Sequence, residues 1–208
     1  SSPDLKVLEI TVEEKATGEI AAGAGVGTDG TSFMFSITEN NWLGRGIKLD
    51  STLDVSQETI SGKISVNNPN FNYSGNSVFS ALEVSSADLT TSSGYESKRT
   101  GFSLGTEFEQ YQNIYLSPSF VAQVESIEVE DNATDSIKKM KGNFTNLDFN
   151  YGITLDQRNQ PFQPTGGYIA RFNQSIPLIQ DSSSFLNGIT ISGYHDFSED
   201  LIAAVKFS

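Results

Sequence analysis

Cysteine is absent from the 208 residues of this chain, and histidine occurs once. Without thiols the chain forms no disulfides and offers no thiolate metal ligands, and a single imidazole is too few for the usual zinc sites. Serine-histidine-aspartate hydrolysis and cysteine nucleophiles also lack their supporting residues. The sequence therefore predicts a protein that is not an enzyme and that holds neither a metal nor a cofactor.

Positive charge and long apolar runs are also scarce. The chain has 13 Lys+Arg against 26 Asp+Glu, a formal net charge of -13, and this opposes binding to the phosphates of nucleic acids. The longest apolar run, residues 20–27, is broken by glycine and is far shorter than the roughly 20 residues of a membrane-spanning helix. The first residues lack the basic start and apolar core of a signal peptide, so we expect a mature chain or a piece of a longer one.

Alternation of apolar and polar residues with a period of two runs through the whole chain and predicts an all-β, antiparallel fold. Many of the predicted segments are close to the 9 to 11 residues of a tilted membrane-spanning strand. The pattern predicts strands over residues 17–27, 32–38, 47–55, 60–67, 78–88, 97–108, 114–128, 147–155, 168–178, 185–195 and 201–207.

The two faces of these strands differ in polarity. One face is predicted to carry Phe33, Phe35, Ile37, Leu147, Phe149, Tyr151 and Ile153. The opposite face is predicted to carry Lys48, Asp50, Asp148 and Asn150. On this pattern alone a membrane β-barrel and a soluble β-sandwich remain equal alternatives, because both alternate in this way.

The connections between the strands are of two kinds. Small turns and polar loops are expected over residues 28–30, 56–58, 85–96 and 131–141. Segments rich in Asn, Pro, Gly and aromatic residues cover 41–46, 67–76, 109–113 and 157–167. Successive connections of an antiparallel meander lie at alternate ends of the strands, so each kind is predicted to gather at one end of the sheet.

Several ordered motifs carry a family resemblance. They are Ser2-Pro3-Asp4 and Lys15-Ala16-Thr17-Gly18, then Asn41, Trp42, Gly44 and Gly46 within residues 39–46, then Asn68, Pro69 and Phe71, and finally Asp156 and Arg158 with Pro164 and Gly166. In this order and spacing they resemble the bacterial surface antigen family of outer-membrane assembly factors, in which periplasmic POTRA domains precede a β-barrel. Asp156 and Arg158 are expected to form a structural ion pair rather than a catalytic one.

The resemblance implies an organisation and a place in the cell. Residues 1–16 would be the end of the final POTRA domain, with a strand over 6–13 and a linker, and residues 17–208 the N-terminal two-thirds of an outer-membrane β-barrel. Eleven strands is an odd number, whereas closed bacterial barrels have an even one, so a fragment is expected. The aromatic and Asn-rich turns would be periplasmic, and the location would be the outer membrane of a Gram-negative bacterium.

The resemblance also implies an activity, which is the folding and insertion of other barrel proteins through a weak lateral seam. The implied partners are nascent outer-membrane β-barrel proteins, lipoproteins that bind the missing POTRA region, and outer-membrane lipid, but no nucleic acid. Other functions left open are a passive outer-membrane barrel, such as a porin or autotransporter translocator, and a soluble secreted β-sandwich.

The first predicted strand is rich in glycine, with Gly18, Gly23, Gly25 and Gly27. Glycine weakens strand pairing, and the resemblance places the lateral seam at this strand, where an incoming strand would add to its edge. The alternative is that these glycines only relieve crowding where the barrel bends.

Overall fold

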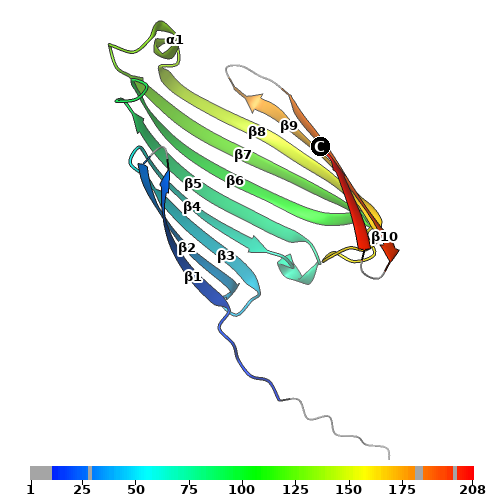
Figure 1. Ribbon diagram of the computed structural model, residues 1–208. Coiled ribbons are helices and arrows are strands. Elements are labelled where there is room, and N and C mark those ends of the chain that lie inside the picture. The colour runs from blue at the N-terminus through cyan, green and yellow to red at the C-terminus, as the bar shows by residue number, and fades with distance from the viewer. Residues whose placement is uncertain (1–10, 28–29, 181–184, 199–200) are drawn as a thin grey trace, which may run out of the picture.

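The computed structural model describes residues 11–27, 30–180, 185–198 and 201–208, which form one antiparallel sheet. Its eleven strands follow chain order from β1 to β11, each paired with its neighbours in sequence (Figure 1). The strands are β1 (Gly18–Gly27), β2 (Gly30–Trp42), β3 (Ile47–Val55), β4 (Thr59–Asn68), β5 (Ser77–Leu89), β6 (Tyr95–Tyr111), β7 (Ile114–Val129), β8 (Gly142–Asp156), β9 (Gly167–Ile179), β10 (Leu186–Ser198) and β11 (Leu201–Phe207). The short helices are η1 (Phe71–Tyr73) and α1 (Asp135–Lys138).

All eleven predicted strands are present, which confirms the all-β antiparallel fold class. The sheet is a single meander that does not close on itself, since β1 and β11 are its two outermost strands. The described residues form one sheet, whereas a β-sandwich needs two, so the fold does not favour the soluble β-sandwich. No helix within the described ranges is long and apolar enough to cross a membrane.

Several predicted boundaries differ from the structure, since β2 runs to Trp42, β6 runs to Tyr111 and β8 begins at Gly142. The loop predicted over residues 85–96 is wrong in its bounds, because β5 continues to Leu89 and β6 begins at Tyr95, with Leu89 paired to Tyr95. Consecutive polar residues such as Ser85 and Ser86 interrupt the alternation that marks a strand, while the backbones remain paired. In the strand predicted over 6–13, residues 6–10 lie outside the described residues and residues 11–13 form no strand. Residues 28–29 of the first predicted turn also lie outside the described part.

One face of the sheet, which we call the outward face, carries the apolar side chains of the alternating pattern. Phe33 pairs with Val55 and Phe35 with Leu53, and further along the sheet Phe149 lies between Phe120 and Ile176. These side chains remain accessible, with Phe33 58% exposed. Their rings lie close together, since the centroids of Phe120 and Phe149 are 5.2 Å apart.

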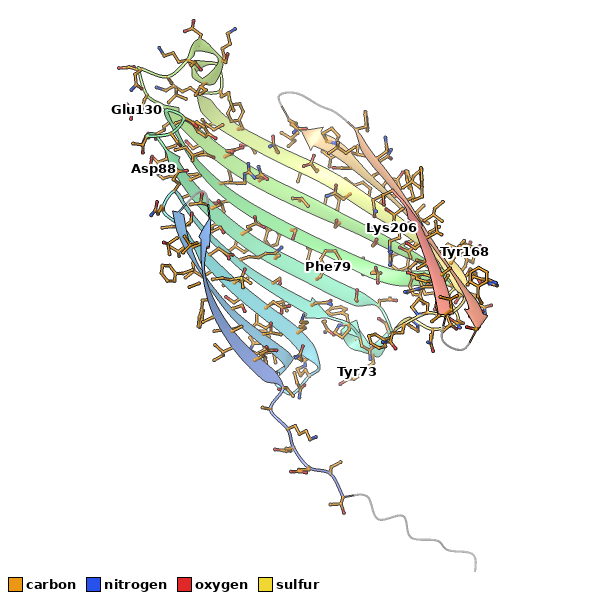
Figure 2. The ribbon with its side chains drawn as sticks, viewed as in Figure 1. Tyr73, Phe79, Asp88, Glu130, Tyr168 and Lys206 are labelled. Atoms are coloured by element: carbon orange, nitrogen blue, oxygen red, sulfur yellow. The ribbon has the colours of Figure 1, made fainter. Side chains whose placement is uncertain are left out.

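The opposite face, which we call the inward face, is polar. It carries ion pairs between Lys48 and Asp50 at 3.2 Å and between Arg99 and Glu125 at 3.1 Å. The ring of Phe79 also lies on this face, against Gly105 at a place where a β-carbon would collide with it (Figure 2). The predicted apolar and polar sets therefore lie on opposite faces, with Asp148 and Asn150 alternating with Phe149 along β8.

The sheet has almost no packed interior. Among the described residues the buried side chains are Ile127, Ile169 and Ser192. The outward face exposes large apolar side chains on every strand, an extent that soluble monomers rarely leave in water. A face of this kind is stable where hydrocarbon covers it.

This sidedness predicts the effect of charge on each face. Replacing Phe149 with Arg in the full-length protein should lower the free energy of unfolding by roughly 2 to 4 kcal/mol, the cost of a cation near the bilayer midplane. Replacing the adjacent inward residue, Asn150→Arg, should cost much less. Urea unfolding in lipid vesicles measures both values, and equal effects of the two variants would invalidate the assignment of faces.

Candidate functional site

The first strand forms an edge of the sheet. β1 pairs with β2 along its whole length, from Gly18 opposite Glu39 to Gly27 opposite Gly30, and has no partner on its other side among the described residues. Half of the backbone N–H and C=O groups of β1 point away from β2 and are therefore available to a new strand. The edge begins directly after residues 11–17, which leave the sheet at its lower end (Figure 1).

The glycines of β1 lie mainly on one face. Gly23, Gly25 and Gly27 alternate along the inward face, whereas Gly18 lies on the outward face beside the carboxylate of Glu39. A β-carbon built on Gly23 or Gly27 would meet no atom within 4 Å, and one on Gly25 would meet only the Ser32 hydroxyl, at 3.3 Å. Crowding therefore does not explain why glycine occupies positions 23 and 27.

The β2–β3 turn brings together the first predicted turn motif. The Asn41 side-chain oxygen accepts a hydrogen bond from the Gly46 N–H at 2.7 Å, and its carbonyl oxygen accepts one from the Gly44 N–H at 2.9 Å. Gly44 and Gly46 have positive φ angles of 67° and 65°, a conformation that glycine adopts without strain. Trp42 pairs with Ile47 at the end of the apolar outward face.

The β4–β5 turn has the same construction. The side-chain oxygen of Asn70 accepts from the Gly75 N–H at 2.8 Å, and that of Asn68 accepts from the Asn70 N–H at 3.1 Å. Pro69 follows the last residue of β4, where the missing N–H removes no ladder bond. The Phe71 N–H donates to the Asn76 carbonyl at 2.8 Å and closes the turn.

A common device closes four turns at this end of the strands, β2–β3, β4–β5, β6–β7 and β8–β9. In each turn a side-chain oxygen close to the strand end accepts a backbone N–H from four to seven residues later. In the other two turns, Glu109 accepts from Asn113 at 2.7 Å and Asn159 accepts from Thr165 and Gly166, both at 3.2 Å. We call these five hydrogen bonds, made to one acceptor side chain in each turn, the turn locks. The composition of the turns was predicted, but the locks were not.

The turns also expose apolar side chains. Tyr73, at the tip of the β4–β5 turn, is 93% exposed and has a positive φ of 57° (Figure 2). Leu43, Tyr111 and Phe162 are prominent at the other turns. Aromatic side chains at strand ends are typical of a membrane–water interface.

Asp156 and Arg158 form the predicted ion pair at the start of the β8–β9 connection, which also contains Pro164 and Gly166. The Arg158 Nη2 and Nε atoms donate to the two Asp156 carboxylate oxygens at 2.6 and 2.8 Å, and Nη1 donates to the Pro161 carbonyl at 3.1 Å. The hydrogen bond that Arg158 donates to Asp156, supported by the negative charge of Asp156, raises the pKa of Arg158. The guanidinium joins the end of β8 to the Pro161 carbonyl, so the arrangement fixes the start of the connection.

Comparisons with known proteins agree with this geometry. The family model of the Omp85 superfamily domain matches residues 17–208. The fold is similar to the crystal structure of BamA from Haemophilus ducreyi lacking POTRA domains 1–3, with a TM-score of 0.67 and 21% sequence identity. The match covers 93% of this chain and 41% of that chain, so this chain spans less than half the length of its structural relative.

The turn locks can be tested at Asn41. Replacing Asn41 with Ala removes the acceptor of the Gly46 N–H, and the free energy of unfolding should fall by about 1 kcal/mol, the net contribution of one hydrogen bond. Asn41→Asp keeps the accepting oxygen and should lose much less. Denaturant unfolding of the full-length protein measures both variants, and equal losses would show that the lock contributes nothing.

Proposed function

Because the chain belongs to the Omp85 superfamily, we propose that it is part of an outer-membrane factor that folds and inserts other β-barrel proteins through a weak lateral seam at β1. The observation that supports this proposal is the run of glycines in β1, which includes Gly23 and Gly27 at positions where the structure leaves room for side chains. A strand of this composition pairs weakly.

The proposed mechanism is an exchange of hydrogen-bond partners. An incoming strand adds to the free edge of β1, and its N–H and C=O groups bond to backbone groups that would otherwise face hydrocarbon unpaired. Weak pairing of β1 lets the seam open and the new strand leave. No covalent bond forms, so the activity needs neither a nucleophile nor a cofactor.

The proposal includes a location and partners. The apolar outward face suits the outer membrane of a Gram-negative bacterium, with lipid as its direct neighbour. Residues 1–16 would be the end of a POTRA domain, residues 17–208 the first part of the barrel, and the four locked turns periplasmic. The clients would be nascent outer-membrane β-barrel proteins, and accessory lipoproteins would bind the POTRA region upstream.

The seam can be tested by strengthening β1. Replacing Gly23 with Val in the full-length protein should raise strand propensity by up to about 1 kcal/mol and slow the assembly of client barrels while leaving the parent folded. Client assembly is measured as the rate at which a client becomes heat-modifiable on gels.

Gly193→Val provides a matched control for this variant. A β-carbon built on Gly193 also meets no atom within 4 Å, but Gly193 is paired on both sides, with Tyr168 and with Val205. The control should assemble clients at the wild-type rate. Unimpaired assembly in a folded Gly23→Val variant would contradict the seam and favour a passive barrel.

The orientation of the protein in the membrane can be tested at the other end of the strands. The connection over residues 131–141 contains α1 and lies far from the N-terminal segment (Figure 1). This connection is proposed to be extracellular, so an epitope tag inserted after Asn132 should bind antibody on intact cells. A tag in the β4–β5 turn should bind only after the outer membrane has been permeabilised. The reverse pattern would invert the proposed orientation.

A further inference from the structure

Two side chains of β2 tie the start of β1 to the sheet. The Asn40 side-chain amide donates to the Thr17 carbonyl oxygen at 2.9 Å, and the backbone N–H of Asn40 donates to the same oxygen at 3.1 Å. The Glu39 carboxylate accepts the Asn41 N–H at 2.7 Å and is also a hydrogen-bond partner of the Thr17 side chain. We call the contacts of Glu39 and Asn40 with Thr17 the base clamp.

The base clamp explains why glycine occupies position 18. Gly18 pairs with Glu39, and a β-carbon built on Gly18 would lie 2.9 Å from an oxygen of the Glu39 carboxylate. A side chain at position 18 would therefore displace this carboxylate, although the backbones could stay paired. Gly23 and Gly27 differ from Gly18, because a β-carbon on either would meet no atom within 4 Å. The glycines of β1 thus do not share one structural reason.

The remainder of β1 lacks comparable side-chain contacts. Residues 21–27 read Ala-Ala-Gly-Ala-Gly-Val-Gly, and none of these side chains can form a hydrogen bond. They face larger residues of β2, as where Ala24 lies opposite Phe33. Glycine also loses more conformational freedom on ordering than any other residue. This part of β1 therefore depends mainly on its backbone ladder to stay on β2.

The base clamp lies at the end of the β1–β2 hairpin where separation would start. Two residues connect Gly27 to Gly30, so the chain itself keeps the far ends of β1 and β2 together. At the other end, residues 11–17 form no strand and lead away from the sheet (Figure 1). Paired strands lose their hydrogen bonds first at such open ends. The clamp adds side-chain hydrogen bonds at the position where the hairpin is most easily opened.

We propose that Glu39 and Asn40 are positioning residues that keep β1 on β2 while the opposite edge of β1 exchanges strands. An incoming strand has two routes: it can add to β1, or it can displace β1 from β2, because the backbone groups of β2 can bond to either strand. The glycines make β1 easy to displace. The base clamp favours addition, since displacement must also break the side-chain hydrogen bonds of Thr17. This inference rests on the proposed strand exchange at β1.

Hydrogen exchange of the full-length protein in lipid vesicles tests the clamp without a client. Asn40→Ala removes one donor to the Thr17 carbonyl. The N–H of Glu19, two residues further on, points toward β2 as the Thr17 carbonyl does. In this variant the Glu19 amide should exchange about fivefold faster, the ratio expected from the loss of one net hydrogen bond. The Gly25 amide, near the hairpin turn, should keep its wild-type rate.

Two further variants separate the clamp from other effects on β2. Gly18→Ala displaces the Glu39 carboxylate and should also speed exchange at Glu19. Ser36→Ala is the matched control, since Ser36 lies on β2 opposite Ala21, whose side chain cannot form a hydrogen bond. This control should leave exchange at Glu19 unchanged.

A cross-link between β1 and β2 tests the role of the clamp in strand exchange. Ile20 pairs with Ile37 beside the clamp, and no cysteine occurs in the 208 residues to compete, so Ile20→Cys with Ile37→Cys should form one disulfide. The oxidised protein should assemble clients at the rate of its reduced form, because β1 stays on β2 throughout. Asn40→Ala should lose client assembly, and the same disulfide should restore it.

Three results would overturn the proposal. The first is equal acceleration of exchange at Glu19 and Gly25 in Asn40→Ala, or none at either, which would deny Asn40 a local anchoring role. The second is slower client assembly when the disulfide forms in otherwise wild-type protein, which would show that β1 leaves β2. The third is client assembly in Asn40→Ala that is unimpaired, or that the disulfide does not restore.

The seam and the clamp can fail separately in these experiments. Hydrogen exchange needs no client, so its result stands whether or not the protein assembles other barrels. Unimpaired assembly in Gly23→Val with the expected exchange at Glu19 would refute the seam and leave the anchoring of β1 in place. Slow assembly in Gly23→Val with unchanged exchange in Asn40→Ala would support the seam and refute the clamp.

Discussion

The backbone hydrogen-bond ladder is the interaction on which the rest of this structure depends. Among the described residues each strand from β2 to β10 has a partner on both sides, whereas β1 and β11 each have one open side. In hydrocarbon each unpaired backbone group costs several kcal/mol, so connections must stay at the ends of the strands and the open sides of β1 and β11 need further partners. The meander order and the need for a partner at β1 are two consequences of this one constraint.

The same constraint explains how the turns are built. At the end of each hairpin the ladder stops while the chain reverses, and the backbone N–H groups released there need other acceptors. The turn locks provide these acceptors from side chains such as Asn41 and Asn70. These hydrogen bonds also hold each turn in one backbone conformation, which allows Leu43 and Tyr73 to keep positive φ angles despite their size.

Much of this could be predicted from the sequence, because alternation reports which face of a strand is covered. All eleven strands and the division between Phe149 and Asn150 follow from that signal. Prediction failed where alternation disappears, as at the paired but polar ends of β5 and β6 between Ser85 and Glu96.

Contacts that depend on the three-dimensional path of the chain could not be predicted from the sequence pattern either. The turn lock of Asn41 depends on the path of five residues, and the hydrogen bonds of Gln174 with Tyr151 and Asn187 depend on the register of three strands. The sequence places Gln174 among Asn173 and Ser175, and only the pairing with Tyr151 and Asn187 reveals that its neighbours across the sheet are polar as well.

Strand length adds a gradient of stability to this sheet. The central strands β6, β7 and β8 contain 17, 16 and 15 residues, whereas β1 has 10. Since the number of ladder bonds grows with paired length, separating β1 disrupts fewer bonds than separating a central strand, and glycine weakens β1 further. The edge proposed to exchange partners is thus joined to a centre that can stay intact while it does so.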